Sequence, residues 1–231
     1  MDLTSRLLAL LGLELDFSIS LSGESLSRIT ETLYVGARPR PGDVAELKDA
    51  GITHVVSCLE EAELAKLRLA GLDVQTLGIA VRDGMDQDIA ASFPQLFEFA
   101  SRAGEDAGSR LLVHCEAGVS RSATLATALL MKSERQTFFE AFGQLRAKRA
   151  GVLPNIGFAS QLQRLEHALY PDRRAGHELS SLARYLREVC QVPIEVELLQ
   201  EVLEQHDYDA ARAIRAIFGG EIPRVVQGVR F

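Results

Sequence analysis

RLLVHCEAGVSRSATLATALLM, residues 110–131, is the stretch of this sequence that decides the fold. RLLVHC is the apolar run of a buried strand, and the residues from Ser120 onward have the composition of a helix. Gly118 lies in the short loop between them. A strand that leads through a tight loop into a helix indicates an α/β fold. It also gathers backbone amides at the positive end of the helix dipole, where an oxyanion binds.

The loop carries a set of reactive residue types. Cys115 opens it, and Arg121 follows six residues later. The amides and the helix dipole favour the thiolate of Cys115, and the guanidinium of Arg121 can donate two parallel hydrogen bonds to a tetrahedral anion. Gly118 allows the tight turn, and the Ser122 hydroxyl can donate to the sulfur. The alternative is a small core cysteine beside a surface arginine, but the fixed offsets between strand and helix favour a nucleophilic site.

Outward from this stretch, short β-rich runs alternate with helical patterns, as in α/β proteins. Asp88 is placed to cap the helix before the RLLVHC strand. We therefore expect a central sheet flanked by helices. The expected strands are 32–36, 53–58, 73–81 and 110–115, and the expected helices are 43–51, 61–71, 88–103, 120–134, 136–150 and 155–170.

A proline and a charged cluster at 170–174 indicate the end of this domain. Three more helices are expected at 178–190, 194–205 and 209–219, the last capped by Asp207 or Asp209 and closed by Gly219 and Gly220. So small a unit is marginally stable alone. The expected parts are an N-terminal extension at 1–27, a catalytic domain at 28–171 and a helical extension at 172–231. LTSRLLALLGL at 3–13 fits either an amphipathic docking helix or a frayed tail.

Composition excludes several classes of protein. The chain has 231 residues, 47% of them hydrophobic, and a formal net charge of −7, with no basic segment of the kind that nucleic-acid binding requires. Its longest apolar runs are too short to span a membrane, and its N-terminus does not fit a secretory signal. Three cysteines, an odd number, indicate a reducing compartment. We expect the protein in the cytoplasm, with the nucleus as a further location.

His114 and Cys115, five intervening residues, and then Arg121 and Ser122 form a pattern that resembles the signature of the cysteine-dependent phosphatases. The SRSATL form and ITETLYVG at 29–36 resemble the dual-specificity branch, over roughly residues 28–170. The resemblance implies a mixed sheet of four or five strands and hydrolysis without a metal or other cofactor. Downstream residues add to the likeness: Pro154, Asn155, Phe158, Gln161 and Leu162.

By this resemblance, Cys115 attacks phosphorus and forms a cysteinyl-phosphate, which water then hydrolyses. Ser122 would assist when the thiolate leaves, and Arg121 would hold the phosphate oxygens together with the loop amides. These amides belong to Glu116, Ala117, Gly118, Val119, Ser120 and Arg121.

One carboxyl group can protonate the leaving oxygen and then deprotonate water. The candidates after the strand at 73–81 are Asp83, Asp86 and Asp88. Asp83 is preferred, because it follows LGIAVRD where the family places its acid, whereas Asp88 fits a helix cap and Asp86 a solvated charge. Asn155 either supports the phosphate loop or simply caps a helix, and both roles can coexist. His114 is expected to bond backbone rather than transfer protons.

Two residues keep open alternatives. Cys58 ends the strand at 53–58, and in some relatives a cysteine on the matching strand traps the catalytic one as a disulfide. A buried apolar cysteine is the favoured alternative for Cys58. Arg149 lies on a helix that heads back toward the loop. Two roles for it are equally favoured: it supports the loop, or it is an ordinary surface residue.

The residues between Cys115 and Arg121 include no Lys or Arg, and Glu116 would repel a polyphosphorylated headgroup. The preferred substrate is therefore a phosphorylated protein, on tyrosine and on serine or threonine. The alternatives are a phosphoinositide or phosphoglucan phosphatase, and a phosphate-binding pseudophosphatase or adaptor that meets a protein partner through 176–231. Those C-terminal helices weakly resemble ubiquitin-associated domains, although CQVP replaces the usual loop. The favoured alternative is a helical extension that packs on the catalytic domain or serves as a dimerisation element.

Overall fold

The computed structural model describes residues 26–67, 69, 71–172 and 179–219, so the segment at 3–13 and Gly220 lie outside the described residues. A five-stranded sheet forms the centre of the fold, in the order β1-β2-β5-β3-β4. The β1 strand is antiparallel to β2, and all other neighbours are parallel. The strands are β1 (Leu26–Arg28), β2 (Leu33–Gly36), β3 (His54–Leu59), β4 (Gln75–Ala80) and β5 (Leu111–His114).

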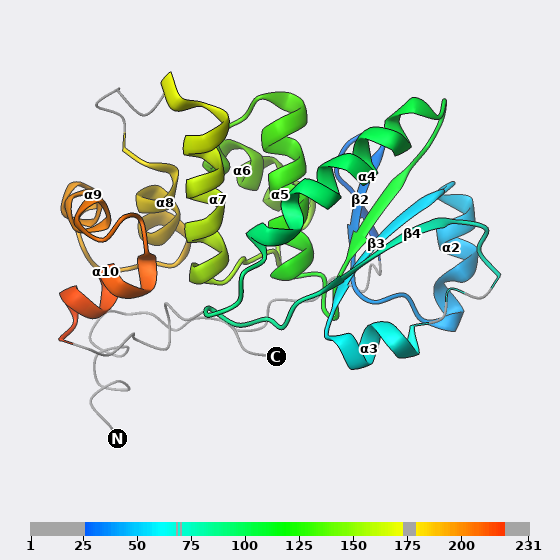
Figure 1. Ribbon diagram of the computed structural model, residues 1–231, viewed down its shortest axis with the longest axis horizontal. Helices are drawn as coiled ribbons and strands as arrows, with labels where there is room; N and C mark the ends of the chain where they lie inside the picture. The colour runs from blue at the N-terminus through cyan, green and yellow to red at the C-terminus, as the bar shows by residue number, and fades with distance from the viewer. Residues whose placement is uncertain (1–25, 68, 70, 173–178, 220–231) are drawn as a thin grey trace.

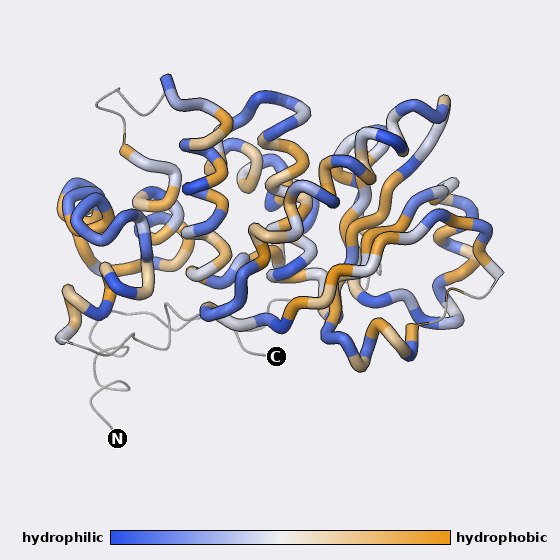
Figure 2. Tube along the Cα trace, viewed as in Figure 1, coloured by the Kyte–Doolittle hydropathy of each residue, from blue (hydrophilic) through white to orange (hydrophobic). Residues whose placement is uncertain are grey.

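The expected mixed sheet is confirmed, with the RLLVHC strand as its central β5. Figure 2 shows apolar residues along the strands of this sheet. All residues of β2, β3 and β5 are buried, as parallel strands covered on both faces require. The sequence pattern predicts no strand at 26–28, because three residues are too few to show an alternation.

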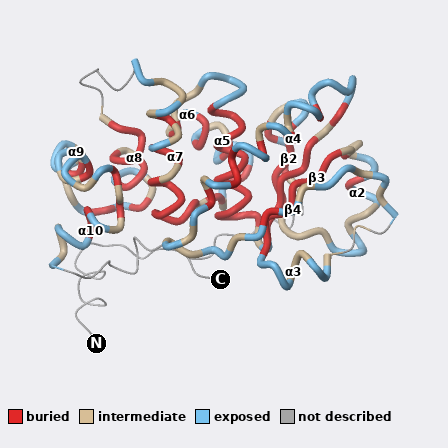
Figure 3. The backbone as a smooth tube through the Cα atoms, in the orientation of Figure 1, coloured by how far each residue is buried: buried red, intermediate tan, exposed pale blue. Residues whose placement is uncertain are grey.

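Helices cover both faces of the sheet (Figure 1). On one face, α2 packs over a small cluster that includes Tyr34, Leu47 and Leu112. On the other, α4 to α7 enclose the main core, in which α5 is buried along most of its length (Figure 3). The elements are η1 (Pro41–Asp43), α2 (Val44–Asp49), α3 (Glu61–Lys66), η2 (Ala90–Ser92), α4 (Phe93–Glu105), α5 (Arg121–Glu134), α6 (Phe138–Lys148) and α7 (Ile156–Leu169).

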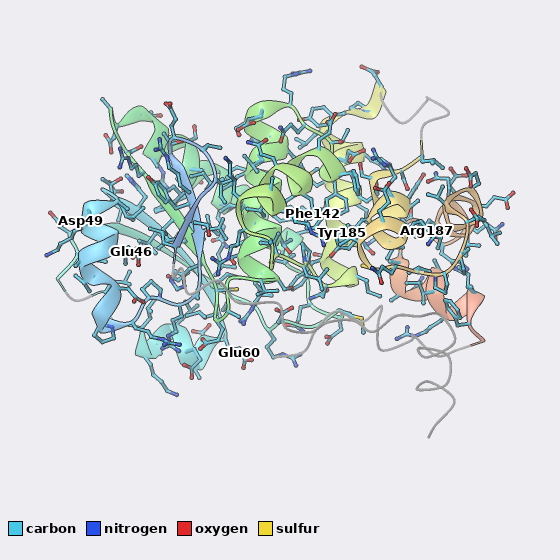
Figure 4. All side chains as sticks on the ribbon, turned by 180° about the vertical axis from the view of Figure 1, so that it is seen from behind. Glu46, Asp49, Glu60, Phe142, Tyr185 and Arg187 are labelled. Carbon is cyan, nitrogen blue, oxygen red and sulfur yellow. The ribbon has the colours of Figure 1, made fainter. Side chains whose placement is uncertain are left out.

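The C-terminal helices continue the same core. Tyr185 is fully buried, and its ring centroid lies 5.3 Å from that of Phe138 and 5.1 Å from that of Phe142 (Figure 4). Its hydroxyl donates to the Pro154 carbonyl at 2.5 Å. These helices therefore pack directly against α6 and the segment before α7. They are α8 (Ser181–Arg184), the π-helical turn η4 (Tyr185–Val189), α9 (Val196–Gln205) and α10 (Ala210–Ile217).

Glu166 of α7 joins these C-terminal helices to α6. Its buried carboxylate accepts from the Phe138 amide at 2.6 Å and from the Ser181 hydroxyl at 2.7 Å. Asp209, rather than Asp207, caps α10 through the amide of Arg212. Among the described residues, no helix has the length and apolar character that crossing a membrane would require.

Candidate active site

The loop after β5 closes around the Cys115 sulfur. The Gly118 amide donates to Sγ at 3.3 Å, and the Ser122 hydroxyl oxygen lies 3.3 Å from the same sulfur. Gly118 has φ +72°, and a Cβ there would lie 2.6 Å from the carbonyl carbon of Gly36. Only glycine can take this backbone conformation so close to β2. The loop is therefore shaped to direct the Gly118 amide at the sulfur.

Arg149 supports the loop from behind. It is buried, and its Nε donates to the Gly118 carbonyl at 2.9 Å while Nη2 donates to the Ala117 carbonyl at 3.4 Å. Its Nη1 donates to the hydroxyl of Ser27 on β1 at 3.1 Å. Because these bonds occupy loop carbonyls, they turn the opposite, amide side of the loop toward the sulfur. Of the two roles left open by the sequence, the surface position is wrong.

Arg121 begins α5 with an incompletely paired guanidinium. Its side chain is buried, and Nη1 donates to the Val81 carbonyl at 3.3 Å. Its Nε has no hydrogen-bond partner among the described residues and lies 3.8 Å from Oδ2 of Asp83. A buried donor without an acceptor is costly, and an oxyanion held by the loop would supply that acceptor.

Asp83 is the acid that the structure brings to the loop. Its Oδ1 accepts from the Ser120 hydroxyl and from the Asn155 side-chain amide, both at 2.8 Å. Asp86 instead lies on the exposed part of the loop, 3.6 Å from Arg82. Asp88 accepts from the Ala91 amide at 3.1 Å and so caps the 3-10 turn η2, whereas α4, the helix that it was expected to cap, begins at Phe93.

Asn155 combines the two roles considered for it. Its Oδ1 accepts from the Phe158 amide at 3.0 Å and so caps α7, while its Nδ2 holds Asp83. Its backbone amide also donates to the Ser120 hydroxyl at 3.2 Å. A single residue therefore links the start of α7, the acid and the phosphate loop.

His114 lies beneath the site as a neutral group. Its Nε2 lies 2.7 Å from the Ser57 hydroxyl, and its Nδ1 lies 3.2 Å from the Cys115 carbonyl. Burial lowers the pKa of His114 to about 4, because the charged imidazolium would lose its hydration. An uncharged imidazole with a partner at each ring nitrogen holds the Cys115 backbone in position and is poorly placed to transfer protons.

Cys58 lies next to Cys115 across the sheet. Ser57 pairs in register with His114, so the following residues, Cys58 and Cys115, are neighbours on adjacent parallel strands. Cys58 is fully buried, and this burial raises the pKa of its thiol well above the ordinary value. Both cysteines are free thiols in the structure.

The loop that carries Asp83, residues 81–89 between β4 and η2, is called the acid loop here, and it rests directly on α7. A Cβ on Gly157 would lie 2.2 Å from the Met85 carbonyl oxygen, so the loop backbone rests against the helix backbone. Gln161 adds two hydrogen bonds at 2.8 Å, to the Gln87 carbonyl and from the Ala90 amide. No cluster of three or more metal-ligating side chains occurs within the parts of the chain that the structure describes.

The outer rim of the loop carries Glu116. Its carboxylate lies 3.5 Å from the guanidinium of Arg38, and its carbonyl accepts from the Arg38 amide at 3.0 Å. Arg38 also pairs with Glu63 of α3, and these carboxylates raise the pKa of its guanidinium. Lys66 also pairs with Glu63 at 3.0 Å, so among the described residues the cations next to Glu116 on this rim are already paired with carboxylates.

Comparisons with known proteins extend this description. The family model "Dual specificity phosphatase, catalytic domain" matches residues 33–168, more than half of the chain. Dual specificity protein phosphatase 26 of Bos taurus is 37% identical over 138 residues, and the match spans 65% of that protein, just under two thirds of its length, and 59% of this chain.

Two further comparisons agree. Dual specificity protein phosphatase 1B of Arabidopsis thaliana is 33% identical over 147 residues, which are 64% of this chain and 85% of that protein. The crystal structure of human DUSP28 has 30% sequence identity and a TM-score of 0.58, and the match covers 63% of this chain and 95% of that one. Residues after 172 lie beyond the family match.

Proposed function

The chain belongs to the dual-specificity phosphatase catalytic domain family, and on that premise we propose that it removes phosphate from phosphotyrosine and from phosphoserine or phosphothreonine in proteins. One observation carries the proposal. The Cys115 sulfur accepts from a loop amide beside a buried Arg121 whose Nε has no hydrogen-bond acceptor among the described residues. This arrangement provides a nucleophile and a donor for the phosphoryl oxygens in the same place.

In the first step, the Cys115 thiolate attacks phosphorus, the S–P bond forms and the P–O bond to the substrate breaks. The departing oxygen takes a proton from Asp83, which lies beside Arg121 and the loop. Arg121 and the loop amides hold the three equatorial oxygens, over which the charge of the transition state is spread.

In the second step, water attacks the cysteinyl-phosphate and gives its proton to Asp83, now a carboxylate. The S–P bond breaks and the thiolate leaves with the electron pair. The Ser122 hydroxyl, 3.3 Å from Sγ, can donate to that departing thiolate. Inorganic phosphate is released and both residues return to their starting protonation states.

The rim of the loop supports a singly phosphorylated protein residue as the substrate. Glu116 engages Arg38, which already pairs with Glu63, so within the described part of the chain this side offers carboxylates and already paired cations to additional phosphates. A polyphosphorylated headgroup would meet carboxylates there. Phosphoinositides and phosphoglucans are the second class of substrate to compare.

The test is hydrolysis of p-nitrophenyl phosphate by the full chain in the presence of EDTA. We expect turnover that disappears in Cys115→Ser, whereas Cys190→Ala, which removes a buried thiol of the C-terminal helices, retains it. Phosphopeptides, phosphoinositides and phosphoglucans are then compared by kcat/KM. Metal-dependent hydrolysis that survives Cys115→Ser would reject the mechanism, and a complete lack of hydrolysis would favour a pseudophosphatase.

A further inference from the structure

A cavity of about 340 Å³ lies beside the proposed acid, and the C-terminal extension forms one of its walls. The other walls are the loop from Asp83 to Asp86 and one face of α7. In Figure 1, the loop between β4 and α4 reaches past the lower end of α7 toward α10. Asp83 and Asn155 line this cavity and also contact the phosphate loop. A group bound there therefore lies next to the reacting centre.

The walls are held in place by α7. Its cavity-facing positions Gly157, Ser160, Gln161 and Arg164 follow the i, i+3, i+4, i+7 spacing of one helix face. Gln161 binds the acid loop, as described above. On the other side, the Ser160 hydroxyl accepts from the Ala210 amide at 3.0 Å, which fixes the first residue of α10.

Three carboxylates and three arginines line the cavity, and two further arginines outside its lining, Arg82 and Arg121, also pair with its carboxylates. Its carboxylates are already engaged: Asp83 with Arg121, Asp86 with Arg82 and Asp209 with Arg212 at 3.5 Å. Two cavity arginines remain without a carboxylate partner among the described residues. Arg164 gives one N–H to the Asp207 carbonyl at 3.2 Å, and Arg215 is exposed on α10.

We propose that this cavity binds an acidic side chain that flanks the phosphorylated residue of a protein substrate, with Arg164 and Arg215 as its recognition residues. The proposal rests on the proposed function, because the ligand is part of the molecule whose phosphate sits at Cys115. Guanidinium groups match carboxylate and phosphate geometry, so Asp, Glu or a second phosphorylated residue shares the required chemistry. An extended peptide can present such a group while its phosphate occupies the loop.

The experiment compares phosphotyrosine peptides that differ only at three flanking positions. In the acidic peptides these positions hold Asp or Glu, and in the neutral peptides they hold the corresponding amides, Asn or Gln. Separate peptides carry the acids before or after the phosphotyrosine, and another carries a flanking phosphoserine. For the unmodified protein we expect a kcat/KM ratio of acidic to neutral peptide on the order of tenfold, since bonds to charged partners are the stronger hydrogen bonds. The phosphoserine peptide shows whether carboxylate or phosphate is preferred.

The ratio should fall toward one in Arg164→Ala combined with Arg215→Ala, and below one in Arg215→Glu. The matched control is Arg187→Ala, because Arg187 is an exposed arginine of η4 that does not line the cavity (Figure 4). It should keep the ratio. Arg215→Glu changes only an exposed side chain, so a folding defect cannot explain its effect; circular dichroism verifies this.

Peptide binding to Cys115→Ser, measured by fluorescence anisotropy, tests the cavity without turnover. If the unmodified protein does not hydrolyse p-nitrophenyl phosphate, the proposed function is rejected. The ratio of acidic to neutral peptide affinity would still show whether the cavity binds acidic side chains. Equal binding and turnover of acidic and neutral peptides would overturn the inference, as would a preference that persists in Arg215→Glu. A phosphoinositide that is hydrolysed faster than every peptide, and depends on the same arginines, would also overturn it.

Discussion

The side-chain Nδ2 of Asn155 donates to the Asp83 carboxylate at 2.8 Å, while the side-chain Oδ1 of Asn155 caps α7. We predict that Asn155→Asp, which retains a good capping residue but loses the donor, lowers kcat about tenfold with little loss of stability. Asn155→Ala should lower both kcat and the free energy of unfolding, the latter by about 1 kcal/mol. Thermal unfolding and steady-state kinetics separate the two roles. Unchanged kcat in Asn155→Asp would mean that the contact with Asp83 has no catalytic importance.

Asp83→Asn removes the proposed proton donor. We predict that kcat for phenyl phosphate, whose leaving group needs a proton, falls by about 10²- to 10⁴-fold. The decrease for p-nitrophenyl phosphate should be much smaller, because its leaving group is more acidic. Asp88→Asn is the matched control, since asparagine also serves as a cap and Asp88 only caps the following turn. An equal loss of kcat for both substrates would assign Asp83 to positioning instead.

His114 should make stability depend on pH. Its pKa in the folded chain is about 4, below the ordinary value near 6.5, so the unfolded chain binds the proton first as pH falls. The contribution to stability is therefore complete above about pH 6.5 and is lost as pH falls toward 4, by about 3 kcal/mol in total. Urea unfolding between pH 4 and 7.5 measures this. His114→Gln should give a flatter curve, and parallel curves for the two proteins would contradict the expectation.

Cys58 is expected to protect the nucleophile from oxidation. It is the register neighbour of Cys115 on the adjacent strand, and neighbouring strands are about 4.8 Å apart, within the span that a disulfide needs. After treatment with hydrogen peroxide, mass spectrometry should detect a peptide pair linked through Cys58 and Cys115. Dithiothreitol should restore activity to this protein and much less to Cys58→Ser. Equal recovery in both would leave Cys58 as a buried apolar residue.

Tyr185 is expected to couple the C-terminal helices to the stability of the whole fold. Burial raises the pKa of its hydroxyl, which therefore remains a donor to the Pro154 carbonyl. Tyr185→Phe should cost about 1–2 kcal/mol, because it leaves a buried carbonyl without that donor. Unfolding should remain a single transition, since both parts share one core. Two separate transitions would instead indicate an independently folding C-terminal domain.

Local sequence patterns were sufficient for the four parallel strands of the sheet and for the phosphate loop. The apolar run before Cys115 and the glycine at 118 define a strand and a turn over adjacent residues, and the central position of β5 agrees with that prediction. The expected helix over 178–190 was less accurate. Its second half is the π-helical turn η4, where Tyr185 is fixed by contacts with α6 that no local periodicity encodes.

Contacts between distant residues were beyond the reach of local patterns. Asp83 meets Ser120 and Asn155 only because β4 and β5 end, and α7 begins, at the same edge of the sheet. The support that Arg149 gives to the Gly118 carbonyl likewise depends on how α6 packs. Side-chain type suggested candidates in each case, but tertiary packing selected their partners.

The contact between Gly157 and Met85 has a consequence for the spacing of the two reactive groups. Because main chain rests on main chain there, the distance from the proposed proton donor to the proposed nucleophile is set by the backbone rather than by a side-chain rotamer. Exposed residues of the acid loop can then vary in evolution without changing the distance between the two groups. A methyl group added at position 157 would clash with the Met85 carbonyl oxygen and push the acid loop away from α7.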